Sequence, residues 1–417
     1  MSDTQTMITA MAVRARSAAR VLAATPSAHK GAALKSAAQK LRAQSNAILA
    51  ANAMDMSAAQ NSGLSAAMLD RLHLDGHRLE AIACSIEQIA DLADPVGAVI
   101  DTRTQPNGLV MERVRVPVGV LGIIYESRPN VTADAAALGL RSGNAVILRG
   151  GSEAINSNRA IHQAMVEGIV EAGLPADAVQ LVPTQDRAAV GAMLRAQGAI
   201  DMIIPRGGKS LVARVQEEAR VPVLAHLDGI NHVFVHKDAD PKMAKDIIVN
   251  AKMRRTGICG ATETLLIDQN YDAPGELVSA LIDAGCEVRG DEMVMELDAR
   301  TVAADEDDWD TEYLDSVISV RMVAGLDEAV EHIARHGSQH TDAIITQDNE
   351  IATRFMSEVD SAIVMHNAST QFADGGEFGL GAEIGIATGR LHARGPVALE
   401  GLTTYKWLVH GQGQTRP

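Results

Sequence analysis

The stretch from Val118 to Ser152 reads VGVLGIIYESRPNVTADAAALGLRSGNAVILRGGS, and it decides the fold. Two short apolar runs, Val118 to Tyr125 and Ala145 to Leu148, flank a segment of helical character. Short runs rich in β-branched residues, bounded by turn residues, predict buried strands. A strand, a helix and a second strand in this order indicate a parallel β-α-β unit.

The same alternation continues along the rest of the chain, with helical segments of roughly a dozen residues between the apolar runs. We therefore expect an α/β fold with two doubly wound parallel-sheet domains. The further strands are expected at Val179 to Val182, Met202 to Ile204, His232 to His236, Glu263 to Ile267, Ser316 to Val323, Ala343 to Thr346 and Ala362 to Met365.

The segments outside this alternation have other patterns. Residues 8 to 94 read as helices throughout, whereas residues 96 to 118 alternate around Pro106-Asn107-Gly108 and predict a long hairpin. Residues 403 to 410 read as a final strand. Long strand edges are normally covered in soluble proteins, so the hairpin and the last strand predict a homo-oligomer.

Composition limits the classes of partner. The 417 residues contain 37 basic and 53 acidic side chains, a formal net charge of -16, which disfavours nucleic acid and anionic membranes. The three cysteines have neither metal-ligand spacing nor a disulfide framework, so we expect no metal and a reducing cytoplasm. The first 54 residues superficially resemble a transit peptide, but their apolar periodicity predicts folded helix instead.

Cys259 is the candidate nucleophile. It lies in Lys252 to Ile267, KMRRTGICGATETLLI, between two glycines and directly before an apolar strand. Flanking glycines allow a sharp turn that brings a main-chain N–H close to a reacting atom, and the basic residues before the loop would favour a thiolate. The alternative is a buried apolar thiol, as most free cysteines are.

Two strand-to-helix corners are candidates for nucleotide binding: Arg149 to Ser152 and Arg206 to Ser210. Backbone N–H groups at a helix start can bind a pyrophosphate, although an ordinary turn is equally compatible with the second corner. No G-x-G-x-x-G follows a strand, and the glycine that a Walker A loop requires is Ile203 here. Asn130 either caps a helix or points its amide at a carbonyl oxygen.

Five segments carry a family resemblance: ESRPNVTADAAALGLRSGNAVILRGGSEA, IPRGGKS, AHLDGINHVFVHKDAD, NAKMRRTGICGATETLL and FGLGAEIGIATGRLHARGP. With them the chain resembles the gamma-glutamyl phosphate reductases, also called glutamate-5-semialdehyde dehydrogenases, and the fold implied is that of the aldehyde dehydrogenase superfamily. The resemblance covers nearly the whole chain, and the cysteine and HARGP segments are specific to this family.

The resemblance implies a reaction and an arrangement of domains. It implies NADPH-dependent reduction of L-glutamate 5-phosphate to the 5-semialdehyde through a cysteine thioester, the second step of proline biosynthesis. An NADP-binding domain is expected at 1–98 and 119–228, a catalytic domain at 229–390, and an oligomerisation element at 99–118 and 391–417. A broad aldehyde dehydrogenase and a silent scaffold are the alternatives. We expect no fused kinase, because the reductase pattern fills the chain, and we expect transient contact with a separate glutamate 5-kinase.

The resemblance also assigns residues. Cys259 is the catalytic thiol and Asn130 contributes to the oxyanion hole; Glu312 holds the nicotinamide ribose, and Arg149 suits the 2′-phosphate of NADP(H). The other cofactor candidates are Gly150, Gly151, Ser152, Gly207, Gly208, Lys209 and Ser210. The substrate candidates are Arg128, Arg255, His226, Ser369 and Arg394.

His226 marks a departure from the wider superfamily. It aligns with the glutamate that activates the hydrolytic water in ordinary aldehyde dehydrogenases, and the nearest carboxylate, Asp228, is shorter and displaced by two residues. A histidine could act as a base or, when protonated, donate to a phosphate oxygen. The departure predicts an acyl-enzyme that persists until phosphate attacks it.

Overall fold

The computed structural model describes residues 3–416, apart from the side chain of Ala67, and the chain forms two compact units. Unit 1 comprises Met1–Ala225, Gly381–Gly385 and Val397–Pro417. Unit 2 comprises His226–Leu380 and Ile386–Pro396. The bounds expected for the domains and the roles assigned to them stay predictions.

The sheet of unit 1 contains four parallel strands in the order β5-β4-β3-β6. All six residues of β3 and all five of β4 are buried, as expected for strands that are covered by helices on both faces. The parallel arrangement predicted from the apolar runs is therefore confirmed. The strands are β3 (Val120–Tyr125), β4 (Ala145–Arg149), β5 (Val179–Leu181) and β6 (Met202–Arg206).

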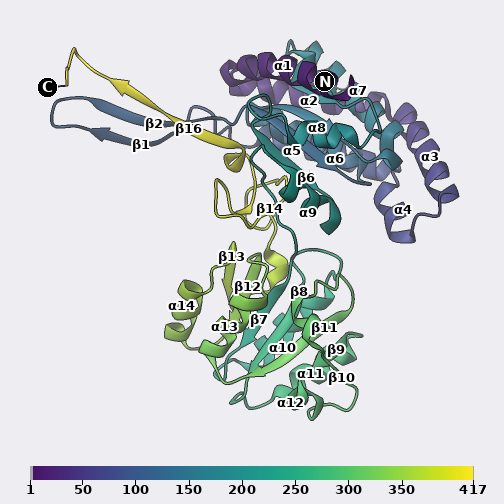
Figure 1. Cartoon of the computed structure of the whole chain (residues 1–417), viewed down its shortest axis with the longest axis vertical. Helices are drawn as coiled ribbons and strands as arrows, with labels where there is room; N and C mark the ends of the chain where they lie inside the picture. The colour runs from purple at the N-terminus through teal and green to yellow at the C-terminus, as the bar shows by residue number, and fades with distance from the viewer. Residues whose placement is uncertain (1–2, 417) are drawn as a thin grey trace. The chain divides into compact units, whose positions relative to one another are not determined.

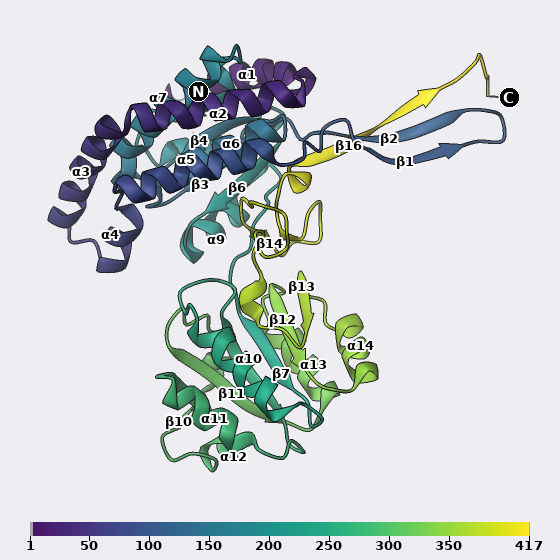
Figure 2. The ribbon, with the colours of Figure 1, turned by 180° about the vertical axis from the view of Figure 1, so that it is seen from behind.

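Helices surround this sheet. The helix α2 lies against α7 and α5, and Figure 2 shows α2, α5 and α6 gathered on one side of the unit. The prediction of helices throughout residues 8–94 is confirmed. The helices are α1 (Asp3–Ala24), α2 (Ser27–Ala43), α3 (Ser45–Asn61), α4 (Ala66–Leu72), α5 (Gly76–Asp91), α6 (Pro129–Arg141), α7 (Ile155–Glu171), α8 (Ala188–Leu194) and α9 (Lys209–Glu218), with 3-10 turns at η1 (Ser152–Ala154), η2 (Ala176–Ala178) and η5 (Glu400–Leu402).

A three-stranded antiparallel ribbon extends from unit 1 (Figure 1). The hairpin of β1 (Val99–Thr104) and β2 (Val110–Pro117) pairs through β2 with β16 (Thr403–His410). Gly108, with φ 85°, has the left-handed conformation that the tight turn requires. The predicted hairpin and final strand are both confirmed.

The sheet of unit 2 contains seven parallel strands in the order β10-β9-β11-β8-β7-β12-β13. Five of them were predicted. The other two, β9 and β10, have four and two residues and lie at one edge of the sheet, so they are too short to show an apolar period. The strands are β7 (Asn231–Val235), β8 (Thr262–Asp268), β9 (Glu287–Gly290), β10 (Val302–Ala303), β11 (Val317–Val323), β12 (Thr341–Ile345) and β13 (Ile363–His366).

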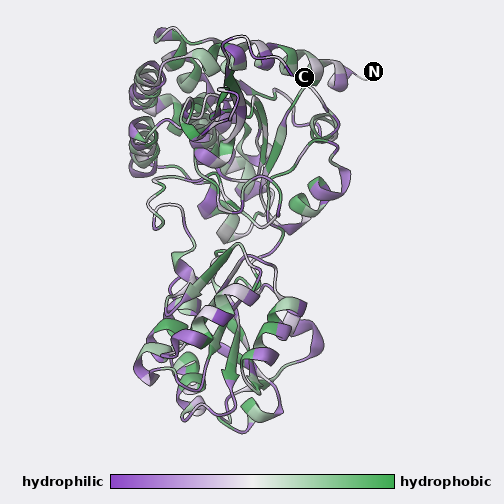
Figure 3. Ribbon diagram, turned by 90° about the vertical axis from the view of Figure 1, so that its left-hand side faces the viewer, coloured by the Kyte–Doolittle hydropathy of each residue, from purple (hydrophilic) through white to green (hydrophobic). Residues whose placement is uncertain are grey.

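The helices of unit 2 pack on both faces of its sheet, and the strands appear mostly green against mixed helices in Figure 3. The helices are α10 (Pro241–Met253), α11 (Pro274–Asp283), α12 (Glu292–Met295), α13 (Leu326–His336) and α14 (Asn349–Glu358), with 3-10 turns at η3 (Glu306–Asp310) and η4 (Thr370–Phe372). The glycine-rich segment near the end of the chain contains only the short pair β14 (Ile386–Ala387) and β15 (Gly395–Pro396). Within residues 3–416, no helix is both long and apolar enough to cross a bilayer.

Candidate active site

Cys259 lies in the loop between α10 and β8, three residues before the strand begins. Its side chain is half-buried and packs against the core of unit 2. Because β8, β7 and β12 are parallel neighbours, the segments that precede them meet at one edge of the sheet. The nucleophile loop is therefore brought together with His226, which precedes β7, and His340, which precedes β12.

The side chain of Asn231 connects these segments. Its Nδ2 donates to the carbonyl oxygens of Cys259 at 2.6 Å and Ala261 at 2.8 Å, and its Oδ1 accepts from the backbone N–H of Thr341 at 3.1 Å. Asn231 is fully buried, so both amide hydrogens and the amide oxygen have partners where water cannot replace them. The sequence reading missed this residue, because an asparagine at the start of a strand gives no distinctive signal.

Gly229 fixes how closely the next segment approaches the nucleophile. A Cβ at this position would lie 2.3 Å from the carbonyl oxygen of Cys259, so only glycine fits without displacing the loop. The backbone N–H of Gly229 donates to Oε1 of Glu312 at 2.9 Å. Glu312, the candidate for the nicotinamide ribose, is therefore bonded to the residue whose backbone lies against that of Cys259.

A histidine pair faces the thiol. One ring nitrogen each of His226 and His340 and the sulfur of Cys259 all lie within 4.8 Å of one another. The two rings meet edge to face with centroids 5.0 Å apart. Burial lowers the pKa of His340 to about 3, and His226 adds a smaller effect in the same direction, so His340 is neutral at physiological pH. Sequence reasoning identified His226 and missed His340, which is 81 positions from the cysteine.

The basic residues before the loop differ in burial. Lys252 is fully buried and forms an ion pair with Glu263, which is also fully buried, so its charge is neutralised within the core. Arg254 and Arg255 are exposed. Lys252 therefore has a carboxylate partner of its own inside the core, as a buried ammonium requires, and its effect on the Cys259 thiol stays a prediction.

The glycines beside Cys259 also act for another reason than the one predicted. Neither Gly257 nor Gly260 has a positive φ, so the loop does not need a conformation restricted to glycine. A Cβ on Gly260 would lie 3.3 Å from the carbonyl oxygen of Thr370, so close packing against η4 favours a small residue there.

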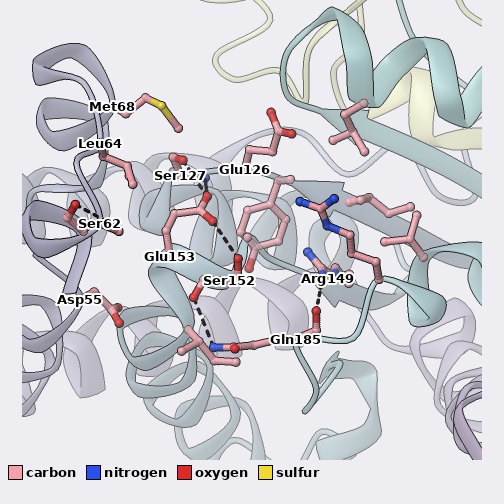
Figure 4. Close-up of a pocket in the computed structure, with 18 of the residues that line it drawn as sticks. Asp55, Ser62, Leu64, Met68, Glu126, Ser127, Arg149, Ser152, Glu153 and Gln185 are labelled. Carbon is pink, nitrogen blue, oxygen red and sulfur yellow. Dashed lines mark hydrogen bonds between the residues drawn. The ribbon is translucent and has the colours of Figure 1, made fainter.

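Unit 1 contains a pocket of about 850 Å³ at the corner proposed for nucleotide binding (Figure 4). It lies beside the carboxyl end of β4 and the start of α9, where phosphate groups bind in open parallel sheets. Four of the eight cofactor candidates of unit 1 line it: Arg149, Gly151, Ser152 and Ser210. Arg187 and Arg214, which were not predicted, also line it.

Arg149 is a buried cation without a carboxylate partner in the described residues. Its NH1 donates to the carbonyl oxygen of Gly150 at 2.9 Å and its NH2 to that of Gln185 at 3.0 Å, whereas its buried Nε has no hydrogen-bond partner among residues 3–416. Burial lowers the pKa of Arg149; the nearby Glu153 opposes this effect, whereas Arg187 and Arg214 add to it. Such a group favours an anionic ligand, so the pocket fits the phosphates of a nicotinamide dinucleotide.

Glu153 stabilises the opposite wall of this pocket. Its Oε1 accepts from both the backbone N–H and the hydroxyl of Ser127 at 2.6 Å, as Figure 4 shows. Ser127 has a φ of 31°, a strained value for a residue with a side chain, and these two bonds hold it there.

The second corner, Gly207 to Ser210, opens α9 as predicted. The backbone N–H of Gly208 donates to Oε2 of Glu126 at 2.9 Å. This N–H thus bonds to a carboxylate of the same unit, and the binding of a phosphate at this corner stays a prediction.

Asn130 occupies the first turn of α6, directly after Pro129. Its Nδ2 donates to Oδ2 of Asp134 at 3.0 Å. The N-cap is Arg128, so the alternative in which Asn130 caps the helix is wrong. An amide carries two N–H groups, and the bond to Asp134 orients the group while using one of them.

The comparisons with known proteins identify the family. Residues 1–291 match the model of the aldehyde dehydrogenase family. Gamma-glutamyl phosphate reductases from Novosphingobium aromaticivorans and Sphingopyxis alaskensis are 68% and 71% identical, over 99% of this chain and 97% and 96% of theirs. The crystal structure of gamma-glutamyl phosphate reductase from Thermotoga maritima is 44% identical with a TM-score of 0.95, and the match covers 98% of this chain and 99% of that one.

The chain belongs to the gamma-glutamyl phosphate reductases. This confirms the resemblance drawn from the five motif segments, and with it the aldehyde dehydrogenase-like fold.

Three of the other substrate candidates have contacts in unit 2. The Oγ of Ser369 caps η4 by accepting from the N–H of Gln371 at 3.3 Å. Arg394 donates to Oδ1 of Asp360 at 2.6 Å and to two backbone carbonyls, and the carbonyl oxygen of Arg255 accepts from Gln371 at 3.2 Å. Their part in binding substrate stays a prediction.

Proposed function

We propose that this protein reduces L-glutamate 5-phosphate to L-glutamate 5-semialdehyde, with release of inorganic phosphate, in the second step of proline biosynthesis from glutamate. Family membership supports the substrate. The observation that carries the reaction type is the presence of His226, in place of a carboxylate, within 4.8 Å of the Cys259 sulfur. Acyl transfer to a thiol needs no hydrolytic water, whereas oxidation to a free acid does.

The chemistry of this chain begins at the sulfur. The Cys259 thiolate attacks the acyl phosphate carbonyl, and the C–O bond to phosphate breaks to leave a thioester and inorganic phosphate. We propose that the second amide hydrogen of Asn130 and a main-chain N–H of the cysteine loop stabilise the negative oxygen of the tetrahedral intermediate. Hydrogen bonds from Asn231 hold the carbonyls of Cys259 and Ala261, so the loop is ordered before substrate arrives.

NADPH, when bound, supplies the hydride that converts the thioester to the aldehyde. We propose that Arg149, supported by Arg187 and Arg214, reads the 2′-phosphate that distinguishes NADPH from NADH. The N-terminus of α9 would hold the pyrophosphate, with Gly207, Gly208, Lys209 and Ser210 at that corner and Gly150, Gly151 and Ser152 at the other. Glu312 is proposed to bind the nicotinamide ribose.

The cations and polar groups proposed to bind the substrate serve different parts of it. Arg128, Arg255 and Arg394 suit a carboxylate or the phosphoryl group, and Ser369 suits a hydrogen bond. His226 is proposed to donate to a phosphate oxygen when protonated.

The proposal extends to assembly and location. Tyr405, Trp407 and Val409 are 50%, 44% and 55% exposed at alternate positions of β16, an arrangement that supports burial against another subunit. We therefore propose a homo-oligomer formed through the ribbon. The glutamyl phosphate would come from a separate glutamate 5-kinase in transient contact, in a reducing cytoplasm that keeps the three thiols free.

The deciding experiment follows NADPH absorbance in a stopped-flow instrument with L-glutamate 5-semialdehyde and NADP⁺. In phosphate-free buffer we expect about one turnover per active site, because the thioester accumulates, and steady turnover when phosphate or arsenate is added. Sustained turnover to free glutamate without phosphate would instead assign the chain to the broad aldehyde dehydrogenases that hydrolyse their acyl-enzyme.

A further inference from the structure

Three side chains that precede the amino ends of β7, β8 and β12 form what we term the Cys259 cluster: His226, Cys259 and His340. One ligand atom from each lies within 4.8 Å of the other two. Ligand atoms around a tetrahedral zinc ion lie roughly 3.3 to 3.8 Å apart, as follows from metal–ligand distances of about 2.0 to 2.3 Å. The three atoms must therefore approach by at most about 1.5 Å.

Nδ1 of each ring forms a hydrogen bond, and this is the pattern found in histidines that bind metals through the other nitrogen. Nδ1 of His226 donates to the carbonyl oxygen of Ile386 at 2.7 Å; a carbonyl can only accept, so Nδ1 carries the hydrogen and Nε2 the lone pair of the neutral ring. Nδ1 of His340 is bonded to Oγ1 of Thr341 at 2.9 Å. Ligating histidines are usually oriented by such a bond at the second nitrogen.

His340 supplies the independent observation that points to a ligand. Its side chain is fully buried, and within residues 3–416 its Nε2 has no hydrogen-bond partner. A buried polar atom without a partner is costly, and binding a cation would remove that cost.

We propose that the Cys259 cluster is an inhibitory binding site for a thiophilic divalent cation of the zinc class. Its ligands would be the Cys259 sulfur and one nitrogen from each histidine, with water in the fourth position. One thiolate and two imidazoles select zinc, cobalt or cadmium over magnesium and calcium, which prefer oxygen. When the metal–sulfur bond forms, the thiol releases its proton to solvent.

The consequence is reversible loss of the nucleophile. A metal-bound thiolate has donated its lone pair and can no longer attack the acyl phosphate carbonyl, so the cation competes with acylation. The cation is not required for the reaction, because no step of the proposed thioester route uses a metal. This regulation goes beyond the proposed reduction and can be tested by binding alone.

The test is titration of the full-length protein with Co²⁺ in the absence of substrate and cofactor. We expect one equivalent per subunit, with a thiolate-to-cobalt charge-transfer band in the near ultraviolet and intense visible bands of four-coordinate cobalt. Zn²⁺ should displace it, and chelation with EDTA should restore turnover. The variants Cys259→Ala and His340→Asn should weaken Co²⁺ binding by more than about 100-fold, since even loss of a residue that orients a ligand weakens binding by about 10 to 100-fold.

Two matched controls separate this site from others. Cys286→Ala removes a buried thiol in the same unit whose pKa is raised by burial to about 12, and His366→Asn removes a half-buried histidine there; both should bind Co²⁺ as the unaltered protein does. If His340→Asn fails to fold, alkylation of Cys259 in a folded Cys84→Ala protein removes the thiolate without a substitution in unit 2. Unchanged Co²⁺ binding after alkylation, or a complex without the charge-transfer band, would overturn the proposal.

Discussion

Asn231 and Cys259 are joined by a hydrogen bond of 2.6 Å from the side-chain amide of the first to the carbonyl oxygen of the second. The same amide oxygen accepts from the N–H of Thr341, the residue after His340. One buried side chain therefore fixes the backbone on both sides of the thiol and histidine pair. The position of the nucleophile depends on a residue that touches neither substrate nor cofactor in the proposed mechanism.

Asn231→Ala should lower kcat by at least tenfold, because the cysteine loop loses the bonds that order it, and should destabilise unit 2 by about 2 to 4 kcal/mol, the range for leaving several buried partners unsatisfied. Urea unfolding followed by circular dichroism gives the stability, and steady-state assays give kcat and KM. The control is the exposed Asn349→Ala, which should change neither. A fully active Asn231→Ala would show that the loop is ordered by other contacts.

The buried pair of Lys252 and Glu263 should make stability depend on pH. Burial raises the pKa of Glu263 to about 7, against an ordinary value of 4.5, while Lys252 acts in the opposite direction. The folded state thus binds a proton that the unfolded state releases. This group's stabilisation is full below pH 4.5 and is lost as the pH rises to about 7.

Lys252→Met removes the cation that opposes this loss. We expect it to destabilise the protein by about 3 to 5 kcal/mol at pH 8, where a buried carboxylate has no partner, and by much less at pH 5. Lys252→Met combined with Glu263→Gln should lose that pH dependence. Thermal unfolding at the two pH values measures both, and an equal effect of Lys252→Met at pH 5 and pH 8 would contradict the ion pair.

Thiol reactivity should separate the cysteines of unit 2. Burial raises the pKa of Cys286 to about 12, so at pH 8 almost none of it is thiolate. Iodoacetamide should label Cys259 well before Cys286, with loss of turnover parallel to the labelling of Cys259. Peptide mass spectrometry over time gives the order, and prior labelling of Cys286 in folded protein would show that the nucleophile is wrongly assigned.

Arg149→Met should weaken NADPH binding far more than NADH binding, because only NADPH carries the phosphate that a guanidinium can bind. The stability should change little, since the substitution removes a buried charge that has no carboxylate partner among the described residues. Fluorescence titration with each cofactor measures the effect, with Arg159→Met, outside the pocket, as control. Equal losses for both cofactors would instead assign recognition of the 2′-phosphate to Arg187 or Arg214.

Trp407→Glu should shift the assembly toward monomer. Trp407 is exposed on β16 between Tyr405 and Val409, and a buried carboxylate at that position would oppose association. Light scattering at micromolar concentration reads the mass. A monomeric mass for the unaltered protein would leave the exposed ribbon without the proposed partner.

The sequence predicted what depends on local pattern. Apolar runs such as Ala145 to Leu148 and the turn at Gly108 determine their own structure, so the parallel strands and the hairpin were predictable. The edge strand β10 has two exposed residues and pairs only because β9 lies beside it, so its own sequence does not predict a strand.

The sequence predicted a site residue only where the residue's own segment has a distinctive pattern. Cys259 stands out in its own loop, whereas His340 and Asn231 reach it because parallel strands place distant residues at one edge. The ion pair of Lys252 with Glu263 was not predicted, because the burial of both side chains cannot be inferred from their charges alone. The role of His226 came from alignment, and its hydrogen bond to Ile386 came only from the structure.

The contact of Gly229 with the Cys259 backbone limits how this enzyme can be varied. A methyl group there would lie 2.3 Å from the carbonyl oxygen, closer than van der Waals contact allows. A library that randomises residues 225 to 231 and selects for growth without proline should therefore recover glycine alone at 229. Anyone who redesigns the substrate range must vary the neighbouring side chains and leave this backbone unchanged.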